Sequence, residues 1–302
     1  MWGHVPPPLP HGVGATDHQH VLKYEDDVFC TCAYVFFAVG HVIARLPEEE
    51  PVSGVTSLDN YLYVLRDGKS SEQIEEYDID SYQLLRRLTV PGVKYVSCII
   101  ACGHSRCVYI SSVSGKCVHR VALPGAAAVT LWPVGDLPTG LSLTVTHSVL
   151  VACYNLRKIK EFSTDGQLLR ELTLTEDLVN LRHAVQLSTG QFIVSHSYGQ
   201  PSFERVCLLD AEGRILRSFG GQQGFEIGHI FVAVDMNGFV CVADSWNDRV
   251  LVLSPTLTYV RKVVSFKQSI LCALHLDDAR RLLYVAIDRI SLLAGRVLVV
   301  SI

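Results

Sequence analysis

Short apolar runs recur along this chain at intervals of roughly 45 residues. Each is followed by a polar loop and by a second apolar run that opens on a basic or polar residue. A repeat of this length, made of short strands, is typical of one blade of a β-propeller, because each blade is a four-stranded sheet. The six leading runs are Tyr61–Val64, Cys107–Ile110, Val149–Ala152, Phe192–Ser195, Val240–Ala243 and Leu283–Ala286.

The segments between these runs predict β-hairpins rather than helices. Thr164–Gln167 and Ala211–Arg214 place a glycine where a tight turn needs a positive φ. The strands that follow such turns mix polar and apolar residues, as outer strands with one wet face do, whereas the leading runs are continuously apolar. The strongest helix candidate, Thr175–Leu187, is short and carries Asn180 at its centre. We therefore expect an all-β fold, a six-bladed β-propeller.

The count of strands predicts how the ring closes. Five complete units run from about residue 52 to 264, and a sixth ends after its third strand, Gly295–Ile302. An unmatched apolar segment, Tyr34–Leu46, stands near the N-terminus. We predict that residues 21–51 complete the last blade and remove an exposed strand edge, so that residues 21–302 form one domain after a flexible leader, residues 1–20. An unrelated N-terminal hairpin is the alternative.

Composition narrows the class of protein. The net charge is −4 and the basic residues form no long stripe, which argues against a general nucleic-acid binder. The ten cysteines show no CxxC or zinc-finger spacing and mostly lie in apolar runs. They are expected to be free thiols of a cytoplasmic protein, although pairing stays open. The apolar stretch Val28–Ala44 is nearly long enough for a membrane span, but its Gly40, His41 and β-favouring residues predict strands, and we expect no membrane contact.

The fifth unit resembles an NHL repeat. Gly238–Leu253 has that family's order: a glycine, an apolar strand ending in Ala-Asp, a polar loop with Asn, then Arg and another apolar strand. The third unit is a diverged copy with Cys153 at the Asp position. Asp244 and Arg249 are expected to fix this turn, because an aspartate can accept hydrogen bonds from a loop while an arginine pairs with it. The resemblance implies a six-bladed propeller similar to the C-terminal partner-binding modules of TRIM-type ubiquitin ligases. RING and B-box zinc patterns are absent from the sequence, so the resemblance implies recognition alone.

Motifs for the common hydrolase, protease and nucleotide-binding sites are absent from the sequence, and we expect no enzyme activity, cofactor or metal. The enzyme alternative is a metal-dependent lactonase or lyase, since propellers of those families place ligands around the central channel. Its candidate ligands are four polar residues on inner strands, without a spacing signature: His183, Gln186, Asp235 and His275.

The predicted function is recognition of a macromolecular partner by a monomeric scaffold. We expect a protein partner, with RNA as the alternative. The contact residues should come from the loops after each blade's second strand and between blades, because exposed aromatic and arginine side chains anchor interfaces. Trp246 is the foremost candidate, with packing against the neighbouring blade as its alternative role. The predicted binding face comprises Arg66, Lys69, Tyr154, Asn155, Arg157, His196, Tyr198, Phe203, Trp246, Asn247 and Arg289.

Overall fold

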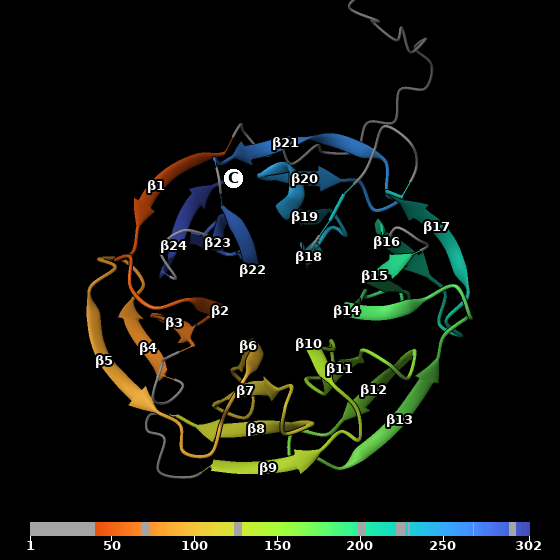
Figure 1. Cartoon of the computed structure of the whole chain (residues 1–302), viewed down its shortest axis with the longest axis horizontal. Helices are drawn as coiled ribbons and strands as arrows, with labels where there is room; N and C mark the ends of the chain where they lie inside the picture. The colour runs from red at the N-terminus through yellow and green to blue at the C-terminus, as the bar shows by residue number, and fades with distance from the viewer. Residues whose placement is uncertain are drawn as a thin grey trace, which may run out of the picture. The chain divides into compact units, whose positions relative to one another are not determined.

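The computed structural model describes residues 40–67, 73–123, 129–198, 203–221, 227–228, 230–267, 269–289 and 294–302. Within these ranges the chain forms six four-stranded antiparallel sheets, which stand around a ring like the blades of a propeller (Figure 1). The predicted fold class, an all-β six-bladed propeller, is confirmed.

Each blade runs from an inner strand at the axis to an outer strand at the rim. Blade 1 comprises β2 (Val52–Leu58), β3 (Tyr61–Arg66), β4 (Gln73–Asp78) and β5 (Leu84–Thr89). Blade 2 comprises β6 (Val96–Cys102), β7 (Cys107–Ser112), β8 (Cys117–Ala122) and β9 (Val129–Pro133). Blade 3 comprises β10 (Pro138–Leu143), β11 (Val149–Cys153), β12 (Lys158–Phe162) and β13 (Leu168–Thr173). Blades 4 and 5 comprise β14 (Val179–Gln186), β15 (Phe192–Tyr198), β16 (Phe203–Leu209) and β17 (Ile215–Phe219); β18 (Ile230–Val234), β19 (Val240–Asp244), the 3₁₀ helix η1 (Ser245–Asn247), β20 (Arg249–Leu253) and β21 (Tyr259–Ser265).

The sixth blade draws on both ends of the described chain. It contains β22 (Ile270–Asp277), β23 (Leu282–Arg289) and β24 (Ala294–Ser301), and its outer strand is β1 (His41–Arg45). β1 pairs antiparallel with β24, with His41 opposite Ser301 and Arg45 opposite Leu298. This pairing covers the edge of β24 that would otherwise be open. The leader and residues 21–39 of the segment predicted to complete this blade lie outside the described residues.

The core is divided among the spaces between neighbouring blades. The second strands β3, β7, β11 and β19 are buried almost throughout, whereas the outer strands β5, β13 and β17 are largely exposed. One apolar cluster packs Val55 and Tyr77 of blade 1 against Tyr284 and Val299 of blade 6. Each blade therefore needs its neighbours to cover its two faces. The apolar runs recur once per blade in the sequence because every blade must supply such faces.

Helical structure is almost absent from the described part of the chain. The predicted helix candidate, Thr175–Leu187, contains the strand β14 instead, in keeping with Asn180 at its centre. Among the residues that the structure describes, none belongs to a helix long and apolar enough to cross a membrane.

Candidate functional site

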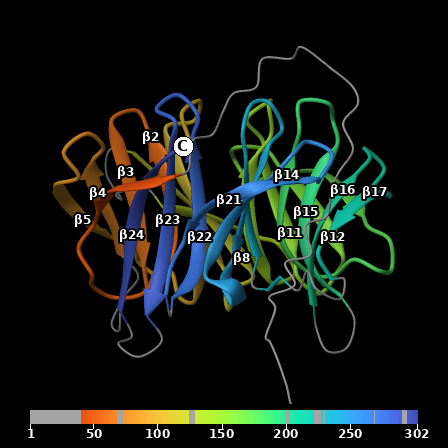
Figure 2. The same cartoon turned by 90° about the horizontal axis from the view of Figure 1, so that it is seen from above.

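Two sets of loops occupy the two ends of the ring, as the edge-on view shows (Figure 2). We call one end the crossover face: it carries the loops that join successive blades and the loops between the second and third strands of each blade. The other end, the hairpin face, carries the remaining turns. Apart from Lys69, which lies outside the described residues, the predicted binding residues belong to the crossover face, so their burial and contacts decide what that face can bind.

The loop that carries Trp246 is held in place by a buried carboxylate. Asp244, at the end of β19, accepts hydrogen bonds from Nδ2 of Asn247 at 2.9 Å and from Nε of Arg249 at 2.8 Å. It also accepts one from the backbone N–H of Gly228 at 3.3 Å. The expected turn-fixing role of Asp244 and Arg249 is confirmed, although the partner inside the loop is the Asn247 side chain rather than a backbone N–H group.

Trp246 is both packed and exposed. Its indole ring lies so close to Gly228 that a Cβ atom added to this glycine would stand only 2.1 Å from the ring atom Cδ2. Even so, 56% of Trp246 is exposed. The loop is also bonded to the next blade, since Ser245 Oγ accepts the backbone N–H of Leu271 at 3.0 Å and Asp248 Oδ1 accepts that of Ser269 at 3.1 Å. The exposed part of the indole ring is therefore presented from a fixed loop beside the start of β22.

Four further exposed apolar residues lie on the crossover face and were not predicted as contacts. Tyr95 comes directly before β6, and Val179 and Ile270 are the first residues of β14 and β22. Leu156 lies in the loop between β11 and β12. Inner strands begin at this face close to the axis of the ring, so Tyr95, Val179 and Ile270 stand around the axis. In the sequence an apolar residue at a strand start looks like a core residue, and only the exposed surface distinguishes the two.

The predicted residues of blade 3 are brought together on this face. Tyr154 is half-buried, and the guanidinium carbon of Arg182 lies 5.3 Å from the centre of its ring. Asn155 is exposed, and its side-chain amide donates to Asp136 at 2.9 Å. Arg157 is half-buried in a left-handed backbone conformation, with φ of 53°. Asn247, the remaining predicted neighbour of Trp246, is exposed.

Two predicted contact residues lie inside the fold, which corrects their assignment to the surface. Arg66 is 1% exposed; its Nε donates to Glu75 at 2.7 Å and its Nη1 to the carbonyl of Gly295 at 2.6 Å, so it joins blade 1 to blade 6. His196 is equally buried, and its Nδ1–H donates to the Ser197 carbonyl at 2.7 Å. Neither side chain is available to a partner. Lys69 and the side chains of Tyr198, Phe203 and Arg289 lie outside the described residues.

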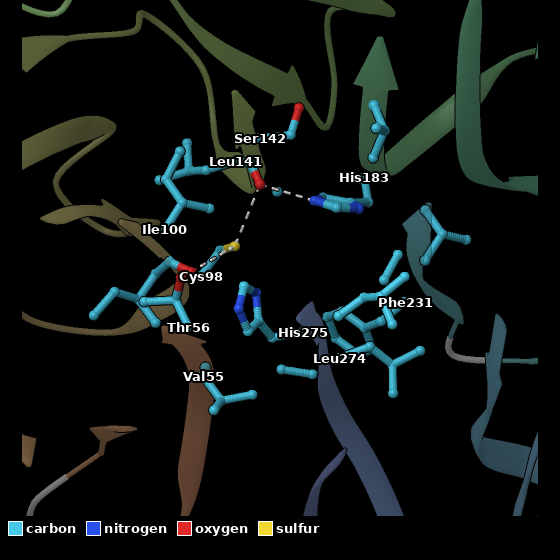
Figure 3. A pocket seen from close by; sticks show the side chains of 18 of the residues that line it. Val55, Thr56, Cys98, Ile100, Leu141, Ser142, His183, Phe231, Leu274 and His275 are labelled. Atoms are coloured by element: carbon cyan, nitrogen blue, oxygen red, sulfur yellow. Dashed lines mark hydrogen bonds between the residues drawn. The ribbon is translucent and has the colours of Figure 1, made fainter. Parts of the chain in front are cut away.

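A pocket of about 250 Å³ lies on the axis of the ring, between the inner strands (Figure 3). Two metal-ligand candidates, His183 and His275, line it, and both already have hydrogen-bond partners. His183 Nε2 donates to the Leu141 carbonyl at 2.8 Å, and His275 Nε2 accepts the backbone N–H of Ser57 at 3.1 Å. Burial lowers the pKa of His183, against the opposing effect of the Leu141 and Val232 carbonyls, and lowers the pKa of His275 to about 4.

The other two metal-ligand candidates belong to a separate hollow on the hairpin face. Gln186 and Asp235 both line it, and Asp235 Oδ1 accepts the backbone N–H groups of Asn237 and Phe239 within its own turn. The structure therefore does not bring the four candidates together. Within the described ranges, no three His, Cys, Asp or Glu side chains are grouped so that they could hold a metal ion.

Comparison with known proteins shows the fold alone. The sequence matches no protein-family model and no curated protein. A streptogramin B lyase structure is 11% identical with a TM-score of 0.58, over 83% of this chain and 94% of that one. A catalytically inactive virginiamycin B lyase from Staphylococcus aureus, solved with quinupristin, is 11% identical with a TM-score of 0.60, over 87% and 99%. A protein of unknown function from Bacteroides caccae is 16% identical with a TM-score of 0.57, over 75% and 82%. This chain is thus a six-bladed β-propeller.

Proposed function

We propose that this propeller is a non-enzymatic recognition scaffold whose crossover face binds a protein partner, with Trp246 at the centre of the contact. The observation that carries the proposal is a tryptophan that is more than half exposed on a loop held by Asp244 and by hydrogen bonds to blade 6. A rigid exposed aromatic loses little conformational entropy on binding, and tryptophan is among the residues that dominate interface energies.

The surroundings of Trp246 support a protein surface. Ile270 follows directly on residues bonded to the Trp246 loop, and Tyr95, Leu156 and Val179 add exposed apolar area on the same face. Apolar and aromatic residues with few charges are typical of the core of a protein interface. The resemblance to an NHL repeat suggests a setting, the substrate-recognition part of a TRIM-like ubiquitin-ligase system.

RNA is the less favoured partner because the arginines of this face are weakly presented, and the exposed cations there, Lys94, Lys116 and Lys267, come from separate loops. Arg66 is buried in an ion pair and Arg157 is half-buried, while Arg182 lies 3.4 Å from the carboxylate of Glu204. Neutralising phosphates requires several accessible cations, and such binding weakens steeply with salt. An RNA ligand would therefore be lost in moderate salt and on Arg157→Glu.

An enzyme is also less favoured, although two of the similar structures are lyases. Burial lowers the pKa of both histidines of the axial pocket, both rings are bonded to their surroundings, and the candidate ligands are divided between two separate hollows. General-base chemistry works best with a pKa near the operating pH, whereas burial lowers the pKa of His275 to about 4.

The experiment uses one matched pair of variants. Cross-linking and quantitative mass spectrometry would identify proteins captured by the wild-type chain, by Trp246→Ala and by Met236→Ala. Met236 is the control because it is 81% exposed on the hairpin face. Each candidate partner would then be purified and titrated by calorimetry.

We expect Trp246→Ala to weaken the Kd roughly 30-fold or more, as loss of an interface anchor does, and Met236→Ala to leave it unchanged. A partner whose affinity does not change in Trp246→Ala would refute the proposed contact. Capture that is lost on nuclease treatment would instead favour RNA.

A further inference from the structure

The axial pocket has an uncharged wall. The residues that line it come from all six inner strands, and none of them is Asp, Glu, Lys or Arg. Most of the wall is apolar, and Ile100, Phe231 and Leu274 are among the residues that line it (Figure 3). A charged molecule would lose its hydration here without gaining a counter-charge, so the wall favours a neutral molecule.

The hydroxyl groups of the wall are already used to join neighbouring inner strands. Ser97 donates to the Thr139 carbonyl, Thr139 to the Leu181 carbonyl and Ser142 to the Ala184 carbonyl, each at 2.7 Å. Thr56 Oγ1 accepts the backbone N–H of Ala101 at 3.1 Å. These bonds hold the ring together at the axis and leave few polar groups for a ligand.

Each histidine of the wall has one ring nitrogen without a hydrogen-bond partner among the described residues, but only that of His275 can donate. In His183 the free nitrogen is Nδ1, which is an acceptor because Nε2–H donates to the Leu141 carbonyl. A backbone N–H can only donate, so the bond from Ser57 N makes Nε2 of His275 the acceptor. The Ser57 hydroxyl lies 2.8 Å from the same nitrogen. A neutral imidazole then carries its hydrogen on Nδ1, and burial keeps the ring neutral by lowering its pKa to about 4. Nδ1 makes no hydrogen bond to any residue that the structure describes, and the ring projects into the pocket (Figure 3).

We propose that the axial pocket binds a small, uncharged, mainly apolar molecule whose hydrogen-bond acceptor is bound by the Nδ1–H of His275. The size is suitable: an apolar protein cavity of about 150 Å³ holds benzene, and this pocket of about 250 Å³ has room for a substituted ring. A single oriented donor in an apolar pocket is the arrangement that fixes such a ligand. This site does not depend on the crossover face or on Trp246.

Two probes of nearly the same shape test the donor. Acetophenone presents a carbonyl oxygen, and α-methylstyrene replaces that oxygen with a CH₂ group. We expect acetophenone to bind the full chain saturably. ¹H–¹⁵N NMR of the histidine rings would detect this binding as a shift of the Nδ1 signal of His275. α-Methylstyrene should bind roughly tenfold or more weakly, because it leaves the buried donor unpaired. Equal affinities, or no saturable binding of acetophenone, would overturn the proposal.

Two variants locate the site. Leu274→Trp fills the pocket without removing a polar group and should abolish acetophenone binding. The double variant Ser57→Ala/His275→Phe removes the Nδ1–H donor together with the hydroxyl that lies 2.8 Å from Nε2 of the same ring, and should reduce the preference for acetophenone to near unity. Circular dichroism and thermal unfolding would establish that each variant is folded. Trp246→Ala serves as the control and should bind acetophenone like the wild type, so failure of the recognition proposal and failure of this one are distinguishable. Binding that persists in a folded Leu274→Trp variant would place the ligand elsewhere and refute the site.

Discussion

The carboxylate of Asp136 accepts the side-chain amide of Asn155 at 2.9 Å, and this pair does in blade 3 what Asp244 and Asn247 do in blade 5. In blade 3 the position equivalent to Asp244, at the end of the second strand, is Cys153, which cannot play this part, and the carboxylate comes instead from the loop that enters the blade. Asp136 also accepts the backbone N–H groups of Asn155 and Leu156 at 2.8 and 2.9 Å. Both blades thus fix the loop after the second strand with a buried carboxylate, but the carboxylate comes from a different position of the blade in each.

Replacing Asp136 with alanine should destabilise the propeller by about 2–4 kcal/mol, because three donors in a mostly buried site lose an ionised acceptor. Urea unfolding would measure the loss. Glu212→Ala is the matched control, since Glu212 is an exposed carboxylate in a surface pair with Arg214 and should change stability by less than about 0.5 kcal/mol. Equal effects of the two substitutions would contradict the role of Asp136.

The same carboxylate should make stability depend on pH. Burial alone would raise the pKa of Asp136, but hydrogen bonds from Asn155, Leu137 and Leu156 outweigh burial and hold the pKa below its ordinary value. An aspartate with a lowered folded-state pKa contributes stability above its unfolded pKa and loses it as the pH falls through the folded pKa. Urea melts of the wild type and Asp136→Asn from pH 6 downwards should therefore converge in acid. A constant difference would show that the charge is not responsible.

Arg66 should be more important to closure of the ring than to binding. It pairs with the buried Glu75 and donates to the carbonyl of Gly295 in blade 6. Removing one partner of a buried ion pair leaves the other charge without compensation and costs about 3–5 kcal/mol. Arg66→Ala should lower the free energy of unfolding by that amount, whereas Arg214→Ala, at an exposed pair, should have almost no effect. Unfolding equal to wild type in Arg66→Ala would contradict the structural assignment.

The sequence predicts those features that depend on neighbouring residues in the chain, and it fails for those that depend on contacts between distant residues. The fold follows from a local pattern, because in each blade buried strands are followed by a largely exposed outer strand, and Val149–Ala152 or Val240–Ala243 can be interpreted without knowing their neighbours. Arg66 could not be assigned in that way. It ends a strand and precedes a polar loop, as a surface arginine would, but in the fold it donates to the Glu50 carbonyl and to the Gly295 carbonyl from the other end of the chain.

The candidate contact residues also differ in this way, because some can be recognised from the local sequence and others depend on residues far along the chain. Trp246 was predicted because a tryptophan in a polar loop is unusual in itself. Ile270 and Val179 were not, because an apolar residue at the first position of an inner strand is indistinguishable in sequence from a core residue until the position of the neighbouring blade is known. The pocket donor of His275 was missed for a related reason: its availability depends on Ser57 taking one ring nitrogen, and the two residues lie 218 positions apart.

His196 and Cys207 offer a last test, of reactivity. Cys207 Sγ lies 3.4 Å from Nε2 of His196, a spacing at which a cysteine and a histidine can form a nucleophile and base. Burial opposes that chemistry, since it raises the pKa of the thiol to about 12 and lowers the pKa of the imidazole to about 4. Both groups are therefore neutral at pH 7, and the thiol donates a hydrogen bond instead of losing its proton. Because only the thiolate is a nucleophile, Cys207 should resist iodoacetamide at pH 8 in the folded protein and react fully in urea, as peptide mass spectrometry would show. Alkylation of Cys207 in the native state at the rate of an exposed thiol would mean that the pair is ionised or open to solvent.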